Sequence, residues 1–96
     1  MRRMDANDWL RQLQAMISLD VAKPFGGSLA SAAQAVKTKM LIVVSKQDHM
    51  VNPLPASAFA DSIHAEKIEL DSDCGHLAPG CESKTLYPRV RAFLDQ

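Results

Sequence analysis

Two residues in the second half of the chain, Asp48 and His76, are of the types that act together in acid–base catalysis. Asp48 follows the apolar run 40–44, and His76 follows the run 67–70, in the sequence Asp73-Cys-Gly-His. If the two runs are adjacent parallel strands, both side chains emerge at the carboxyl edge of the sheet, where open α/β sheets form their sites. The carboxylate could then hold the imidazole in one tautomer and stabilise its protonated form. Asp48 and His76 are therefore the candidate catalytic residues, and a turn role is the alternative interpretation of each.

Hydrophobic patterning predicts the elements that would position this pair. Residues 40–44 are apolar throughout and rich in β-branched side chains, which favours a strand covered on both faces, as in a parallel sheet. Residues 67–70 alternate in polarity, as an edge strand does. From residue 40 the order is strand, helix, strand, helix, which predicts an α/β fold. Apolar spacing and capping residues predict helices over residues 5–19, 28–36, 56–63 and 82–94.

Two parallel strands do not form a stable sheet without neighbours. We therefore expect one domain over residues 1–96 whose sheet is incomplete, with a helical lead-in over 1–37 and the strand–helix–strand–helix part over 38–96. Unpaired strand edges are templates for association. The expected partners are a missing N-terminal portion of the fold and a second copy of the chain, as a homo-oligomer.

Composition narrows the classes of partner. The chain has 96 residues, 47% hydrophobic and 23% charged, with a formal net charge of zero. Zero net charge argues against a nucleic-acid partner or an anionic membrane, because both select a basic surface. The longest apolar run, 40–44, is far shorter than the roughly 20 residues of a membrane span. Residues 1–5 have no apolar stretch behind them, so no secretory signal is expected and the location is predicted as cytoplasmic.

The two cysteines, Cys74 and Cys81, are expected to be reduced thiols in a cytosolic protein, with a disulfide as the alternative. Together with His76 and His49 they could be considered as zinc ligands. The pattern Cys-x-His-x4-Cys lacks the two close ligand pairs of structural zinc sites, so no metal site is predicted. No bound cofactor is predicted either.

Two segments resemble a known fold family. Leu41–Asp48 followed by Asn52-Pro53 is similar to the acid-bearing strand and loop of α/β-hydrolases, and residues 73–76 resemble their histidine loop. Residues 5–10, with Asp20-Val21 after the first helix, resemble the homoserine O-acetyltransferase branch. The resemblance covers nearly the whole chain and implies the C-terminal portion of an α/β-hydrolase fold. It also implies that Asp48 orients His76 as general base, in an acyltransferase or esterase whose full-length form could use acetyl-CoA as co-substrate.

The nucleophile that this resemblance requires is not found in the chain. The fold places its serine in Gly-x-Ser-x-Gly, between a buried strand and a helix. The near match Gly26-Gly-Ser28-Leu-Ala follows a segment that contains Pro24 and is not a buried strand, so Ser28 is interpreted as a helix cap. We therefore expect the serine to lie upstream of Met1 and the isolated chain to be inactive.

One position departs from the branch. In homoserine O-acetyltransferases an aspartate that helps to hold the substrate amine typically follows the catalytic histidine, and here that position is Leu77. Because a neutral side chain cannot pair with an ammonium group, a hydrolase or an acyltransferase with another acceptor stays open. The alternative function is a catalytically inactive interaction or oligomerisation module of the same fold.

Overall fold

A computed structural model describes residues 3–96 and divides the chain into two units, Met1–Ala32 and Ala33–Gln96. In the first unit, helix α1 (Ala6–Ser18) begins with a capping box. The Asp5 carboxylate accepts hydrogen bonds from the backbone N–H groups of Asn7 and Asp8, at 2.8 and 3.0 Å, and the Asp8 side chain accepts one from the backbone of Asp5. These bonds satisfy N–H groups that the first turn of a helix leaves unpaired. The predicted first helix and its cap are confirmed.

Helix α2 (Leu29–Gln34) follows a short 3-10 helix at Lys23–Phe25. The Ser28 hydroxyl oxygen accepts a hydrogen bond from the backbone N–H of Ser31 at 3.1 Å. This is the bond that a capping serine makes at a helix N-terminus, so the interpretation of Ser28 as a cap is confirmed.

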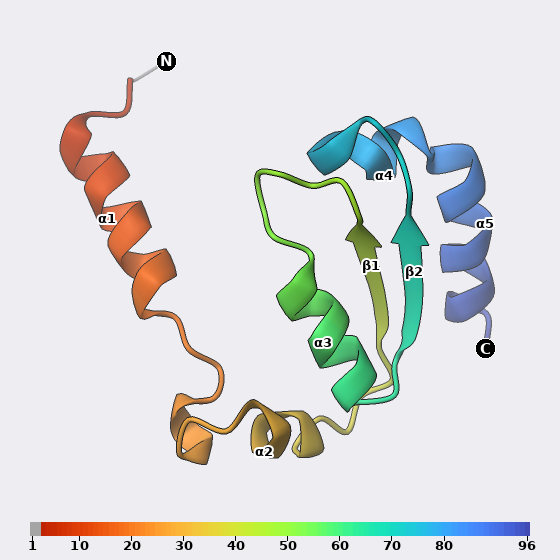
Figure 1. Ribbon diagram of the computed structural model, residues 1–96, viewed down its shortest axis with the longest axis horizontal. Coiled ribbons are helices and arrows are strands. Elements are labelled where there is room, and N and C mark those ends of the chain that lie inside the picture. The colour runs from red at the N-terminus through yellow and green to blue at the C-terminus, as the bar shows by residue number, and fades with distance from the viewer. Residues whose placement is uncertain (1–2) are drawn as a thin grey trace. The chain divides into compact units, whose positions relative to one another are not determined.

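The second unit is built on two parallel strands, β1 (Leu41–Ser45) and β2 (Glu66–Leu70), which pair with Val43 opposite Ile68 and Ser45 opposite Leu70. Figure 1 shows the two arrows side by side, pointing to the same edge of the sheet. Helix α3 (Leu54–Ser62) connects the strands, and α4 (Ala78–Cys81) and α5 (Ser83–Leu94) follow β2. The predicted order of strand, helix, strand and helix is confirmed, with α4 as an additional short helix.

The alternation of side chains along β2 places α3 and α5 on opposite faces of the sheet. Lys67 contacts Ser57 and Asp61 of α3, whereas Ile68 and Leu70 pack in a cluster with residues of α4 and α5. Successive side chains of a strand point to opposite faces. The second unit is therefore a two-stranded sheet between helices. Polar contacts join one face of β2 to α3, and apolar side chains pack on its other face against α4 and α5.

The apolar core of the second unit lies between the strands and α5. Ile68 is fully buried, and burial of a side chain of this size contributes about 2–3 kcal/mol. Its buried neighbours include Ala78, two residues after His76, so the core reaches the loop that carries the imidazole. The full cluster comprises Ile68, Leu70, Ala78 and Leu86, with Leu41, Val43 and Val90 packed against it.

Two expectations need correction. Leu41, Ile42 and Val43 are only half-buried, although an all-apolar strand predicts cover on both faces. A sheet of two strands with one helix on each face is too narrow to cover them. Cys74 and Cys81 form a disulfide with their Cα atoms 6.5 Å apart, so the expectation of two reduced thiols is wrong. The intervening helical turns bring the cysteines within the usual range for a disulfide, which an argument from compartment does not detect.

None of the helices formed by residues 3–96 combines the length and the apolar character that crossing a membrane requires.

Candidate active site

The candidate site lies at the carboxyl edge of the sheet, where both strands end (Figure 1). Asp48 comes three residues after β1, in the loop that leads to α3. His76 lies in a short 3-10 helix, Gly75–Leu77, that follows β2. Because Ser45 and Leu70 are paired at the ends of parallel strands, the two loops leave the sheet from neighbouring positions.

Asp48 and His76 are in direct contact. The Nδ1 atom of His76 is 2.9 Å from Oδ2 of Asp48. An ionised carboxylate only accepts hydrogen bonds, so Nδ1 carries the proton and donates it. In the tautomer that this bond favours, Nε2 is the nitrogen that carries the lone pair. The Asp48 side chain is 11% exposed and the His76 side chain 46% exposed, so the acid is sheltered while the imidazole is open to a reacting group.

The second carboxylate oxygen of Asp48 organises its own loop. Oδ1 accepts hydrogen bonds from the backbone N–H groups of Met50 and Val51, both at 2.9 Å. The bond from Val51, followed by that from His76 Nδ1–H, lowers the pKa of Asp48 below its ordinary value of 3.8. The carboxylate is therefore ionised at neutral pH. Because the folded-state pKa is lowered, these contacts stabilise the fold above the unfolded pKa, and the benefit is lost as the pH falls through the folded value.

Asp48 was interpreted either as a turn residue or as part of a site. The structure is compatible with both, because each of the two carboxylate oxygens makes one kind of contact. Oδ1 makes the local turn that an aspartate often makes after a strand. Oδ2 faces His76 of the other loop. The structure brings the two predicted residues together, and their catalytic role stays a prediction.

Two residues that the sequence did not single out join the loops to each other. The hydroxyl of Ser45 donates to the carbonyl oxygen of Gly75 at 2.6 Å. The side-chain carbonyl of Gln47 accepts from the backbone N–H of Ser72 at 3.0 Å, and its amide group donates to Asp71. The only available signal for Ser45 was a hydroxyl at the end of an apolar strand, and Gln47 gave none.

Gly75 permits the close approach of the two loops. Its φ is +56°, in the left-handed region, and a Cβ atom at this position would lie 3.1 Å from the backbone oxygen of Gln47. An L-residue here meets both backbone strain and a backbone atom that cannot easily move. The glycine that precedes His76 is therefore a requirement of the site geometry.

We expect Gly75→Ala to destabilise the fold by about 1–3 kcal/mol, because it combines a left-handed backbone with a tight contact. The measurement is the midpoint of urea unfolding, together with the NMR signals of the His76 ring. Gly80→Ala is the matched control, since a Cβ there meets nothing within 4 Å and no positive φ applies. Equal stability of the two variants would contradict the assigned role of Gly75.

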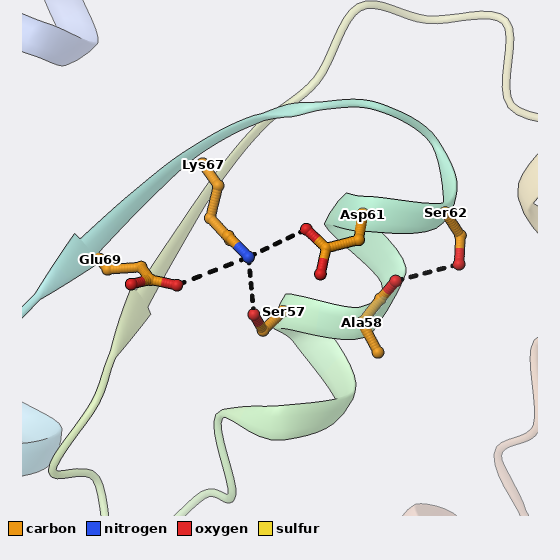
Figure 2. Close-up of polar contacts among 6 residues, drawn as sticks. All are labelled: Ser57, Ala58, Asp61, Ser62, Lys67 and Glu69. Carbon is orange, nitrogen blue, oxygen red and sulfur yellow. Dashed lines mark hydrogen bonds and ion pairs between the residues drawn. The ribbon is translucent and has the colours of Figure 1, made fainter.

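A second polar cluster joins α3 to β2 and includes a serine beside a lysine (Figure 2). Lys67 Nζ lies 2.9 Å from the Ser57 hydroxyl, 3.0 Å from Asp61 and 3.5 Å from Glu69. The hydrogen bond that Lys67 donates to the Asp61 carboxylate is the main cause that raises the pKa of Lys67 above 10.5. A lysine that is held protonated cannot take a proton from a serine, so this cluster is an ion-pair contact between α3 and β2 and not a nucleophile with its base.

The remaining candidates do not assemble a site. Cys74 and Cys81 share a disulfide and therefore offer no thiolates to a metal. Across residues 3–96 no group of three or more His, Cys, Asp or Glu side chains could hold a metal ion. A hollow of about 400 Å³ opens at the amino edge of the sheet, lined by residues that include Met40 and Glu66. It contains neither member of the candidate pair.

Comparison with known proteins gives three curated relatives, all named homoserine O-acetyltransferase. Over 97% of its residues, this chain is 31% identical to the one from Acidiphilium cryptum and 30% identical to the one from Bradyrhizobium diazoefficiens. Over 96% of its residues, this chain is 26% identical to the one from Mesorhizobium japonicum. No family model and no solved structure matches. The chain spans 24–26% of these relatives and is thus distantly similar to homoserine O-acetyltransferases over about a quarter of their length.

Proposed function

We propose that this chain supplies the acid and the general base of a Ser-His-Asp triad in an α/β-hydrolase-fold acyltransferase, with the serine provided from outside the chain. The observation that carries the proposal is the 2.9 Å contact between His76 Nδ1 and Asp48 Oδ2 at the carboxyl edge of two parallel strands. The order of acid and then base along the chain is that of α/β-hydrolases. The similarity to homoserine O-acetyltransferases extends over both residues and supports acyl transfer as the reaction.

In this reaction His76 Nε2 takes the proton of the serine hydroxyl while the serine oxygen attacks the carbonyl of an acyl thioester such as acetyl-CoA. The imidazolium that forms is stabilised by Asp48, which already accepts a hydrogen bond from Nδ1. The thiolate leaves with the proton from Nε2, and an acyl-serine remains. An acceptor hydroxyl then gives its proton to Nε2 and attacks the acyl-serine. The serine oxygen leaves with the proton that Nε2 returns to it, which restores the free serine and the neutral imidazole.

The residue that follows His76 in the sequence indicates which kind of acyl acceptor the proposed site could bind. Leu77 follows His76 and is 71% exposed. Met50 lies in the loop between β1 and α3 that carries Asp48, here called the acid loop, and Leu54 is the first residue of α3. Both are also apolar and exposed. An ammonium group would find no counter-charge on these three side chains. We therefore propose that the acyl acceptor is not homoserine. It is either water or a hydroxyl compound that carries no ammonium group.

A second function, an interaction module, is favoured by a different observation. The apolar side of α1 is exposed, with Trp9 57%, Met16 71% and Ile17 83% accessible. Within residues 3–96, the two-stranded sheet also leaves one edge of each strand unpaired. These surfaces would associate with a second copy of the chain or with a chain that completes the sheet.

A chimera separates the two functions. The segment of the Acidiphilium cryptum relative that aligns with this chain is replaced by this chain, and release of CoA from acetyl-CoA is followed with a panel of hydroxyl acceptors that includes homoserine. We expect CoA release with at least one acceptor, while the 96-residue chain alone gives none. A folded chimera that releases no CoA, together with a chain that self-associates in analytical ultracentrifugation, would instead support the interaction module.

A further inference from the structure

The loop that carries His76 is closed by a covalent bond. Cys74 precedes His76 by two residues and Cys81 follows it by five, and the two sulfur atoms form a disulfide. Both cysteines are exposed. The bridged segment contains the 3-10 helix Gly75–Leu77 and helix α4. The disulfide therefore ties the segment just before the imidazole to the end of α4.

The two ends of this segment are held by different forces. On the α4 side, Ala78 is fully buried in the apolar core with Ile68 and Leu86. On the other side, the backbone N–H of Cys74 donates to the Ser72 hydroxyl at 3.2 Å. The disulfide is the covalent link through which the core-anchored end restrains the exposed end.

We propose that the Cys74–Cys81 disulfide is a redox-responsive site that dithiol reductants open, and that its state sets the freedom of the His76 loop. A thiolate of the reductant attacks one cysteine sulfur and forms a mixed disulfide, and the partner thiol of the reductant then resolves it. The cysteines gain two electrons and two protons and become thiols, while the dithiol becomes a disulfide. The exchange reverses when an oxidised dithiol returns the bond.

Two features make this bond suited to exchange without loss of the fold. Both cysteines are exposed, and exposed disulfides are the ones that reductants reach and open most readily. The bridge spans only seven positions, and a disulfide that closes a short loop restricts the unfolded chain less than one that closes a long loop. Within the core cluster, Ile68, Leu70 and Leu86 lie outside the bridged segment and Ala78 alone lies inside it. Reduction is therefore expected to act on the loop and to leave the sheet in place.

The test uses the 96-residue chain, purified without reductant. Dithiothreitol should convert it from no titratable thiols to two, and amide hydrogen exchange at residues 75–77 should become roughly tenfold faster or more, as expected for local opening. Exchange at Ile68 and Leu70 should stay unchanged. Reoxidation should restore slow exchange in the loop.

The double variant Cys74→Ser/Cys81→Ser is the control. It should show fast exchange at residues 75–77 with or without dithiothreitol, and protection at Ile68 reports that it is folded. The inference is overturned if the purified chain carries two thiols that do not oxidise, if dithiothreitol leaves the bond intact, or if reduction leaves the loop's exchange unchanged.

The effect of loop mobility on turnover rests on the proposed function. A second experiment distinguishes a failure of the redox proposal from a failure of the proposed function. In the chimeric acyltransferase, reduction should lower turnover severalfold, and the double serine variant should not respond. If turnover does not depend on His76 at all, the proposed function fails while the exchange result at residues 75–77 stands by itself. If turnover depends on His76 but ignores the disulfide, the redox control is refuted and the triad stands.

Discussion

Replacement of His76 by alanine should lower acyl transfer by about 10⁶-fold in the chimeric acyltransferase, the size of loss recorded when the base of a Ser-His-Asp triad is removed. Such a loss corresponds to about 8 kcal/mol of transition-state stabilisation. The reason is that Nε2 of His76 is the atom that takes the serine proton, and alanine has no group that can replace it. The measurement is kcat for CoA release at saturating acetyl-CoA.

His49→Ala is the matched control for this variant. His49 is an exposed imidazole in the acid loop, next to Asp48 in sequence. Its removal should leave kcat near that of the parent. Because the His76 side chain is 46% exposed, His76→Ala should also keep the fold, which circular dichroism can verify. Turnover close to the parent in a folded His76→Ala protein would refute the assignment of the base.

Asp48→Asn should lower kcat by about 10⁴-fold, the effect of a wrong imidazole tautomer in serine proteases. The amide oxygen of asparagine can still accept from the backbone N–H groups of Met50 and Val51, so the turn is kept. The amide NH₂ then faces His76 Nδ1 as a donor. The ring responds by carrying its proton on Nε2, where it can no longer accept the proton of the serine.

Asp73→Asn provides the charge-matched control, because Asp73 is an exposed carboxylate of the loop that precedes His76. Both substitutions remove one negative charge, but only Asp48→Asn removes the partner of Nδ1. We expect KM for acetyl-CoA to be similar in all three proteins. Equal kcat values for the two variants would show that Asp48 acts through general charge and not through the tautomer of His76.

Hydrophobic patterning predicted both strands and the longer helices, though not α4, and it predicted the edge at which the candidate pair lies. An apolar run and an alternating run separated by a helix predict a parallel pair, and parallel pairing brings the carboxyl ends of both strands together. Asp48 and His76 could therefore be predicted as neighbours without knowledge of any contact. Their catalytic role does not follow from the patterning, because the pattern determines where the side chains lie and not how they react.

The features that the sequence did not reveal depend on the detailed path of the loops. Ser45 meets the carbonyl of Gly75 from 30 residues away, and Gln47 meets Ser72 from 25 residues away. No local pattern encodes such contacts. The disulfide was missed for another reason: its formation depends on how far the chain turns between Cys74 and Cys81, whereas the sequence argument considered only the compartment.

The pairing of β1 and β2 has a consequence for the insertions and deletions that this chain can tolerate. Each residue added to a strand advances the chain by about 3.3 Å, which is comparable to the 2.9 Å between Nδ1 of His76 and Oδ2 of Asp48. A single insertion within residues 66–70 would shift the imidazole out of reach of the carboxylate or reverse the faces of the strand. Insertions where the helix α3 meets its flanking loops would leave the pairing of Ser45 with Leu70 unchanged. Length variation should therefore accumulate in the crossover connection and be excluded from the strands.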